Sequence, residues 1–409
     1  MRPGTISPLA GRGASPLAGR TILQIIPELD AGGAERTTVD IADAVIRAGG
    51  RALVACEGGR LVSDVQALGG LWIPFPAKTK NPLRMAANVG RLAKIIRDEA
   101  VDIVHARSRA PAWVALGAAR RTGVGFVTTY HGAYAGKSSL KILYNSVMAR
   151  GDAVIANSLF TRDRILEMHP FARDRLHVVH RGTDMRTFAA AAVDPGRVQR
   201  LRRSWGVEPD DRVVLLAARL TAWKGQRVLI DAARLLAERG VTDVRYILAG
   251  DEQGRSAYVR DLDERIERAG LAGVVRRAGH CTDMPAAFLA ASCVVVASTE
   301  PEAFGRSAVE AQAMGAPVVV TDIGAAAETV LAPPAVAPDA RTGWRIAPND
   351  PPALADAVGG ALGLRASQRD ALARRARSHV EEQFSLEKMC GETLDIYGQL
   401  LEQRLAAPR

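Results

Sequence analysis

Two glutamates frame a segment whose residue types suit a phosphorylated ligand. Glu302 and Glu310 stand on either side of Gly305, and the segment follows the apolar run Val294–Ser298. We expect a strand, a loop and then a helix that begins at Gly305. Free N–H groups and the positive end of such a helix can hold a diphosphate. Glu310 would then accept hydrogen bonds from a ribose diol, and Glu302 would meet sugar hydroxyls. The spacing alone would equally suit two surface glutamates.

Two cations follow another apolar run. Arg219 and Lys224 come directly after Val213–Ala217, so we expect both at the carboxyl end of a strand. A guanidinium can bind phosphate in two places at once and an ammonium adds a movable charge, so the pair can converge on one diphosphate. We expect no metal, since the one Asp-x-Asp motif, Asp261-Leu262-Asp263, lies in a polar helical pattern. Electrostatic stabilisation by the two cations would replace a bound ion.

Three further sites follow strand-like runs. Gly32 and Gly33 come after the first run, where two glycines let a ligand approach the backbone closely. His131 directly follows the run Val124–Tyr130, and Gly250 directly follows the run Arg245–Ala249. We predict that Gly250 lines a base pocket through its backbone and that His131 faces the ligand. A lone histidine is otherwise most often structural.

Apolar runs rich in Val, Ile and Leu alternate with amphipathic helical patterns along the chain. This alternation predicts α/β architecture with parallel sheets covered on both faces. A polar stretch at 189–203 interrupts the series. We therefore predict two doubly wound, Rossmann-like domains, with ligands at the carboxyl ends of the strands.

The predicted domain boundaries follow from these patterns. Residues 1–20 repeat Ser-Pro-Leu-Ala-Gly-Arg and are predicted to be a disordered tail. The first, acceptor-side domain would span 21–188, and the second, donor-binding domain 189–385. An amphipathic helix over 386–409 would pack back toward the first domain. The four scattered cysteines form no metal-type pair, so we expect reduced thiols.

The chain resembles the family 4 glycosyltransferases, retaining enzymes of the GT-B fold. The likeness rests on the glutamate pair in its setting of Pro301, Phe304-Gly305 and Ala311–Val319, and it covers nearly the whole chain after residue 20. It implies two Rossmann-like domains that face a central cleft. It also implies that Glu302 contacts the donor sugar, that Glu310 contacts the ribose, and that Phe304 and Gly305 offer backbone amides.

The same resemblance assigns the other candidates. Arg219 and Lys224 would carry the charge that develops on the leaving nucleoside diphosphate. The loop at Gly32 and Gly33 would face the donor phosphates and the acceptor, and His131 would hydrogen-bond a sugar hydroxyl. The family's usual second glycine is missing near Glu328, which leaves that residue only a candidate donor contact. No cofactor is implied beyond the nucleotide-sugar substrate.

The uneven distribution of charge along the chain indicates the class of acceptor. Residues 1–188 hold 26 Lys and Arg against 15 Asp and Glu, a surplus of 11, whereas the remaining 28 and 29 nearly cancel. Such a field favours an anionic surface, although a solvated basic face would look the same. Thr129–Gly132 and Tyr144–Met148 resemble enzymes of lipopolysaccharide-core or envelope-polysaccharide assembly. We expect a lipopolysaccharide or lipid-linked acceptor, and a cytoplasmic protein peripheral to the inner membrane; a small soluble acceptor is the alternative.

Two other classes fit less well. A nicotinamide oxidoreductase needs a Gly-x-Gly-x-x-Gly fingerprint that the segment around Gly32 lacks. A nucleic-acid-binding protein would explain the basic first half, but not the balanced second half that holds the densest motifs. We expect no nucleic-acid partner.

Overall fold

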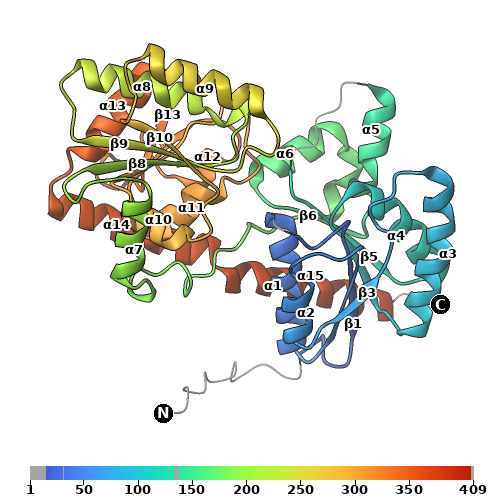
Figure 1. Cartoon of the computed structure of the whole chain (residues 1–409). Coiled ribbons are helices and arrows are strands. Elements are labelled where there is room, and N and C mark those ends of the chain that lie inside the picture. Colours follow the sequence, from blue (N-terminus) through green and yellow to red (C-terminus); the bar gives the residue numbers. More distant parts are fainter. Residues whose placement is uncertain (1–14, 31, 133–137, 407–409) are drawn as a thin grey trace. The chain divides into compact units, whose positions relative to one another are not determined.

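The computed structural model describes residues 15–30, 32–132 and 138–406, which form two compact units (Figure 1). The first contains the described residues up to Asn157, then Arg162–Val179 and those from Cys390 onward. The second contains Ser158–Thr161 and His180–Met389. The chain thus passes into the second unit at His180, before the predicted boundary at 188/189.

The first unit is built on a parallel sheet of seven strands in the order β3-β2-β1-β4-β5-β6-β7. Leu23, Val104 and Phe126 from its central strands are fully buried, as expected of a parallel sheet covered on both faces. The strands are β1 (Thr21–Ile25), β2 (Arg51–Cys56), β3 (Leu71–Pro74), β4 (Ile103–Ala106), β5 (Gly125–Tyr130), β6 (Ala153–Ala156) and β7 (Leu176–Val178).

Helices connect these strands and bury their apolar faces against the sheet. Leu92 and Ile96 of α3 join the same core as Ala115 of α4. The Asn81 side chain caps α3 by accepting from the N–H groups of Leu83 and Arg84. The helices are α1 (Gly33–Arg47), α2 (Val62–Ala67), α3 (Pro82–Asp98), α4 (Arg109–Thr122), α5 (Ser139–Asn145) and α6 (Leu159–Met168), with the 3-10 turns η1 (Ser146–Ala149) and η2 (Pro170–Arg175).

The last helix, α15 (Leu386–Ala406), joins the first unit from Cys390 onward. Tyr397 is fully buried, and its hydroxyl lies 2.5 Å from His105 Nδ1. The other ring nitrogen of His105 lies 2.7 Å from Thr129 Oγ1. A buried, doubly hydrogen-bonded imidazole therefore links β4, β5 and the C-terminal helix.

This histidine predicts a dependence of stability on pH. Burial, together with nearby Arg107 and His131, holds the pKa of His105 well below its ordinary value of 6.5. Below that pH the unfolded chain gains a proton at His105 that the folded chain does not. The free energy of unfolding should therefore fall on acidification, by up to about 1.4 kcal/mol per pH unit.

Chemical denaturation at a series of pH values would measure this effect. His105→Gln keeps two hydrogen-bonding groups but cannot take up the proton, so its stability should fall less steeply below pH 6.5. His280→Gln, at an exposed position of the second unit, is the matched control and should follow the wild type. Equal slopes in all three proteins would contradict the prediction.

The N-terminal tail is shorter than predicted. Residues 1–14 lie outside the described residues, but the prediction that residues 15–20 join no core is wrong. Leu17 is fully buried. Gly19 N–H donates to Gly49 O, and Arg20 Nη1 pairs with Asp102 at 3.1 Å. The buried Leu17 side chain and these two contacts hold residues 15–20, the second copy of the Ser-Pro-Leu-Ala-Gly-Arg repeat, against the first unit.

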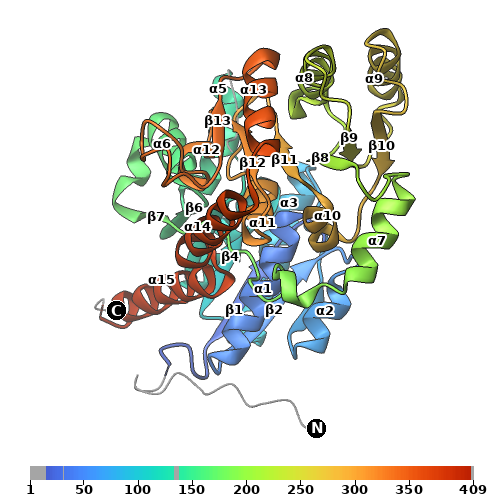
Figure 2. The same cartoon turned by 90° about the vertical axis from the view of Figure 1, so that its left-hand side faces the viewer.

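The second unit contains a parallel sheet of six strands in the order β10-β9-β8-β11-β12-β13. Figures 1 and 2 show α8, α9 and α13 on one face and α7, α10 and α11 on the other, in agreement with the two cores that these helices form with the sheet. The strands are β8 (Arg212–Ala217), β9 (Val244–Ala249), β10 (Val275–Gly279), β11 (Cys293–Val296), β12 (Val318–Thr321) and β13 (Trp344–Ile346).

The polar stretch at 189–203, which the sequence placed at the start of the second domain, is part of this second unit. It forms the 3-10 turn η3 (Ala190–Ala192) and helix α7 (Pro195–Ser204), which Asp194 caps. Arg197 of α7 pairs with Asp283 at 2.6 Å and thereby ties α7 to α10. A short helix with few apolar residues looks like a linker when only hydrophobic periodicity is considered. The remaining helices are α8 (Gln226–Glu238), α9 (Ser256–Arg268), α10 (Met284–Ala290), α11 (Arg306–Ala313), α12 (Ala326–Thr329), α13 (Pro351–Leu362) and α14 (Ala366–Phe384).

Among the helices that the structure describes, none has both the length and the apolar character that a membrane span requires.

Candidate active site

An ion pair between Lys224 and Glu302 lies at the carboxyl ends of β8 and β11. Lys224 ends the 3-10 turn η4 (Ala222–Lys224), and Glu302 lies in the loop before α11. Lys224 Nζ donates to Glu302 Oε1 at 2.7 Å, and Ser298 Oγ donates to the same oxygen. The side chains of Lys224 and Glu302 are only 15% and 18% exposed, so water screens their attraction less than that of a surface pair. The structure thus joins two residues that the sequence assigned to different parts of a donor.

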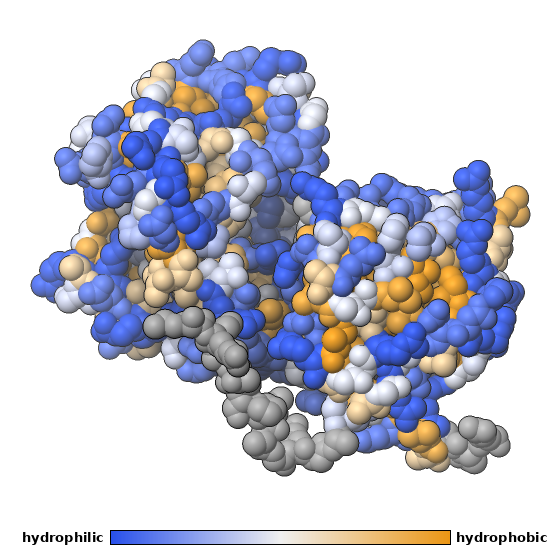
Figure 3. Space-filling model, turned by 60° about the horizontal axis from the view of Figure 1, so that its bottom comes forward, coloured by the Kyte–Doolittle hydropathy of each residue, from blue (hydrophilic) through white to orange (hydrophobic). Residues whose placement is uncertain are grey.

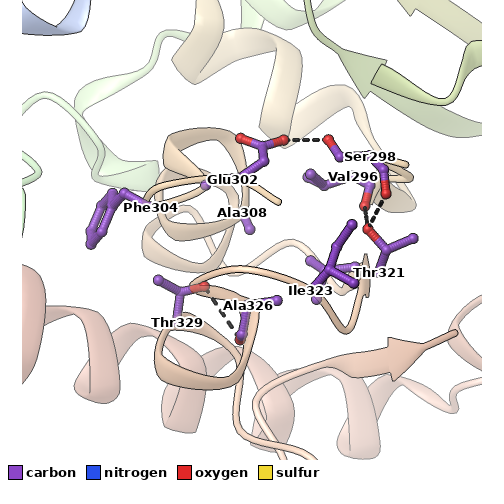
Figure 4. A pocket seen from close by; sticks show the side chains of 11 residues that line it. Val296, Ser298, Glu302, Phe304, Ala308, Thr321, Ile323, Ala326 and Thr329 are labelled. Atoms are coloured by element: carbon purple, nitrogen blue, oxygen red, sulfur yellow. Dashed lines mark hydrogen bonds between the residues drawn. The ribbon is translucent and has the colours of Figure 1, made fainter. Parts of the chain in front are cut away.

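Glu302 also lines a pocket between the β11–α11 segment and the residues that follow β12. In Figure 4 the carboxylate of Glu302 turns toward Ser298, whereas the ring of Phe304 points away from the cavity. Thr321 Oγ1 donates to Ser298 O at 2.7 Å and so fixes the floor beside the carboxylate. The lining residues are Val296, Ser298, Glu302, Phe304, Gly305, Ala308, Val320, Thr321, Ile323, Ala326 and Thr329.

The start of α11 has the geometry expected of an anion-binding loop. Gly305 is the N-cap residue with φ +84°, a conformation that glycine adopts without strain. The backbone N–H groups of Phe304 and Gly305 donate to no acceptor among the described residues. The Phe304 side chain is buried and meets Phe384 edge to face, with ring centroids 5.5 Å apart. Phe304 is therefore a packing residue that leaves only its backbone for a ligand.

Glu310 is held in place by its own helix. It lies one turn after Arg306, whose Nε and Nη2 donate to Glu310 Oε1 at 2.9 and 2.6 Å. The Glu310 side chain is buried, with 8% exposure. No described residue donates to Oε2. A buried carboxylate with one oxygen engaged and the other available is suited to accept from a diol.

Arg219 lies at the same strand end but is bound differently. Its carbonyl accepts from Gln226 Nε2 at 3.0 Å, which fixes the backbone of the β8–α8 loop. Its side chain is exposed and pairs with none of the described residues. Arg219 therefore presents an uncompensated positive charge, whereas the charge of Lys224 is partly neutralised by Glu302.

Gly250 has a packing role that the sequence pattern did not reveal. Its N–H donates to Gly279 O at 2.7 Å. A Cβ atom at this position would stand 1.8 Å from Ala218 O, well inside any permitted contact. Gly250 thus lets the loops after β8 and β9 cross closely. Its contact with a nucleotide stays a prediction.

The first unit holds the other candidates at the carboxyl edge of its sheet. Gly32 is the N-cap of α1 in extended conformation, and Gly33 begins that helix directly after the β1 loop. His131 follows β5 and lies beside Arg107, with 3.5 Å between Arg107 Nη1 and His131 Nε2. Because an arginine side chain can only donate, Nε2 of His131 is the acceptor in this contact. This direction is consistent with a neutral imidazole that carries its proton on Nδ1.

Arg107 is the residue that sequence reasoning missed. Its side chain is buried, its Nε donates to Gln24 Oε1 at 2.8 Å, and its Nη2 has no hydrogen-bond partner among the described residues. A buried cation without a carboxylate in contact is uncommon. Arg107 follows a short apolar strand just as His131 does, so the rule that selected His131 would also have selected it.

Three carboxylates of the second unit are occupied by structural contacts. Glu328, a candidate donor contact, accepts from the N–H groups of Leu159 and Phe160 at 2.6 and 2.7 Å and thereby caps α6. Asp261 pairs with Arg227 at 2.7 Å and Asp263 with Arg277 at 2.7 Å. The described residues contain no group of three or more His, Cys, Asp or Glu side chains arranged to hold a metal.

Comparison with known proteins agrees with this arrangement. Residues 31–187 match the model of Glycosyltransferase Family 4, and residues 198–379 match that of Glycosyl transferases group 1. The structure is similar to a glycosyltransferase from Rickettsia africae, with a TM-score of 0.85, 32% identity and coverage of 94% of this chain and 99% of that one. It also resembles Anabaena HepE in complex with UDP-glucose, with a TM-score of 0.77, 26% identity and coverage of 92% and 99%.

The first curated relative matches over a smaller part of the chain. D-inositol 3-phosphate glycosyltransferase of Xylanimonas cellulosilytica is 30% identical over 268 residues, which are 64% of this chain and 60% of the relative. The match thus spans less than two thirds of that relative. Three findings indicate the same family: the two Rossmann-like units, the matches to both family models and the similarity to the Rickettsia structure. The chain therefore belongs to the family 4 glycosyltransferases, which have the GT-B fold.

Proposed function

We propose that this protein transfers a hexose from a nucleotide-diphosphate sugar to an acceptor hydroxyl with retention of anomeric configuration. The observation that carries the proposal is the Lys224–Glu302 pair beside the start of α11. A cation, a helix N-terminus and a carboxylate lie there within one short stretch of sheet edge. Glu310, fixed by Arg306, adds a second carboxylate on the same helix.

Each group has a proposed role toward the donor. The diphosphate would lie against the N–H groups at Gly305, with Arg219 and Lys224 supplying positive charge. Glu310 would accept from the ribose diol, and Glu302 would accept from hydroxyls of the transferred sugar. His131 would hydrogen-bond another sugar hydroxyl, and the loop at Gly32 and Gly33 would give the phosphates room to approach.

The reaction would proceed on one face of the sugar. The acceptor hydroxyl attacks the anomeric carbon from the side on which the nucleoside diphosphate departs. The bond from that carbon to the phosphate oxygen breaks, the bond to the acceptor oxygen forms, and a β-phosphate oxygen takes the acceptor proton. Arg219 and Lys224 stabilise the charge on the leaving diphosphate, and positioning supplies much of the remaining acceleration.

We propose a UDP-hexose as the donor, because HepE, 26% identical to this chain, was solved with UDP-glucose. Slow donor hydrolysis across UDP- and GDP-sugars, followed by mass spectrometry, tests this choice. Consumption of GDP-mannose alone would contradict the choice of UDP and indicate a guanine nucleotide as the donor. A thermal-shift series with UDP, NAD and an oligonucleotide tests the reaction class, since only the first should stabilise the protein.

We expect turnover to be independent of added divalent metal. In the proposed site, the positive charges of Arg219 and Lys224 would take the place of a metal ion at the diphosphate. Initial rates should therefore be the same with EDTA and with added Mg²⁺. A loss of more than about tenfold in EDTA that Mg²⁺ restores would show that these cations do not suffice.

The acceptor class has two candidates. A lipid-linked or lipopolysaccharide-core glycan is favoured by the surplus of 11 basic residues in 1–188. Figure 3 shows apolar residues exposed among hydrophilic ones on one face, and Leu83 of α3 and Leu140 of α5 are 82% and 78% exposed. A small phosphorylated polyol is favoured by the relatives named D-inositol 3-phosphate glycosyltransferase.

Product formation from each acceptor class separates the two candidates. If the first holds, glycosyl transfer should occur to lipid-linked glycan in vesicles, and sedimentation with anionic vesicles should weaken at high salt. Transfer to inositol phosphate in solution, with no vesicle binding at low or high salt, would favour the second. Donor hydrolysis without transfer to either would leave the transferase proposal standing but remove both acceptors.

A further inference from the structure

A second cationic site lies in the first unit, apart from the residues considered above. It is a pocket of about 400 Å³ lined by three arginines, one aromatic ring and one aliphatic side chain: Arg120, Arg150, Arg175, Phe171 and Leu116. All five belong to the first unit. Phe171 is 51% exposed, so part of its ring faces the pocket opening and is open to contact.

The fold places the arginines at the amino ends of neighbouring strands. Arg120 is in the last turn of α4, which leads into β5. Arg150 precedes β6, and Arg175 ends η2 directly before β7. Because the sheet is parallel, these positions share one edge, opposite the edge that carries Arg107 and His131. The pocket is therefore separate from the candidate active-site residues.

The charges in this pocket are poorly compensated. Asp152 pairs with Arg120 at 2.7 Å, and its carboxylate also accepts from Phe126 N–H and lies 3.8 Å from Arg404. Arg150 and Arg175 have no carboxylate partner among the described residues. Arg150 donates to Ser146 Oγ at 3.1 Å, and the buried Nε of Arg175 has no partner.

The aromatic ring orders two of the guanidinium groups. The Cζ atoms of Arg150 and Arg175 each lie 5.7 Å from the centre of the Phe171 ring. Cation–π contact holds the planar groups without using all of their N–H donors. His169 lies beside the same ring, and burial and the Arg150 charge lower its pKa, so the neutral form of the imidazole is favoured and adds no positive charge.

We propose that this pocket binds a phosphate group, as a phosphomonoester or an inorganic phosphate ion. Converging guanidinium groups match the oxygens of phosphate in geometry and charge. Neither a neutral sugar nor a cation would offset the positive charges of Arg150 and Arg175, which no described carboxylate neutralises. The phosphate could be that of a soluble ion or that of a lipid headgroup, with Phe171 and Leu116 as the apolar contacts. The proposal does not depend on which sugar the enzyme transfers.

The test uses the full chain and a pair of matched double variants. Arg150→Gln with Arg175→Gln removes two pocket charges. Arg121→Gln with Arg173→Gln removes two charges from α4 and η2, at exposed positions that do not line the pocket. Calorimetric titration with inorganic phosphate measures the soluble form. Sedimentation with phosphatidylcholine vesicles, with and without phosphatidic acid, measures the lipid form.

Binding in either assay should fall at least about tenfold in the pocket variant, as expected for lost charge-assisted hydrogen bonds, and less than about twofold in the control. Loss of phosphate titration assigns the site to soluble phosphate. Loss confined to phosphatidic acid vesicles assigns it to a lipid headgroup. No binding in either assay, or equal losses in both variants, overturns the proposal.

Two further variants keep these outcomes interpretable. Lys224→Ala should leave binding at this pocket unchanged, which separates it from any phosphate bound at the donor residues. Arg150→Lys with Arg175→Lys keeps the charge but removes the planar fork, and should weaken phosphate binding while preserving the fold. If the glutamine variant fails to fold, the lysine variant serves as the test of the proposal. An affinity for phosphate equal to that of the wild type in the lysine variant would overturn the proposed geometry.

Discussion

Lys224→Ala should lower kcat about 10²–10³-fold, the usual loss when one preorganised electrostatic donor is removed. Lys224 Nζ lies 2.7 Å from Glu302 Oε1, and in the proposed reaction it would stabilise the negative charge that develops on the departing diphosphate. Its removal also leaves Glu302 without its cation, with only Ser298 still donating to that oxygen. Steady-state kinetics with donor in excess would measure the loss, and the wild-type value of kcat in the variant would refute the assignment.

Two further variants isolate the catalytic charge from a purely structural pairing. Arg227→Ala removes a cation three residues away whose partner is Asp261 of α9, so kcat should change little. In the double variant Lys224→Ala, Glu302→Gln, the unpaired carboxylate is gone. If Lys224 served only to neutralise Glu302, the double variant would be as active as Glu302→Gln alone; we expect it to be clearly less active than Glu302→Gln.

Gly250→Ala should lower the free energy of unfolding of the second unit by about 1–3 kcal/mol, as overpacking commonly does. The added Cβ would stand 1.8 Å from the backbone oxygen of Ala218, and a backbone atom cannot turn aside as a side-chain end can. The loop that carries Arg219 would have to shift, so donor binding should weaken together with stability. Thermal unfolding without any ligand measures the first effect directly.

The matched control for Gly250 is Gly359→Ala in α13. A Cβ there meets Leu236 Cδ2 at 3.7 Å, an ordinary contact, and alanine favours the helix. Its unfolding temperature should stay the same or rise. A Gly250→Ala variant with the unfolding temperature of the wild type but weakened donor binding would show that Gly250 acts through the ligand alone.

The fold class followed from the sequence because parallel strands buried on both faces are continuous apolar runs. Val213–Ala217 and Val124–Tyr130 were predicted as strands and are β8 and β5 within one residue. β3, β7 and β13 are edge or near-edge strands of three or four residues, too short and too exposed to give that signal.

The roles of individual carboxylates could not be assigned by spacing. Asp261 and Glu328 are both acidic residues near predicted motifs, yet each is taken up by a structural contact. The partner of Asp261 is a guanidinium 34 positions away, and that of Glu328 is a backbone N–H 169 positions away. No local pattern contains that information.

The segment from Glu302 to Glu310 illustrates which features the sequence determines and which require the tertiary structure. The sequence alone determined a strand, a loop and a helix opened by Gly305, because periodicity and glycine chemistry are local. It also determined which residues could hold a phosphorylated sugar. Only the tertiary structure decided that Lys224 lies against Glu302, that Phe304 turns into the core and that Gly250 permits a loop crossing. These contacts join residues far apart in the chain, and packing of the whole unit sets them.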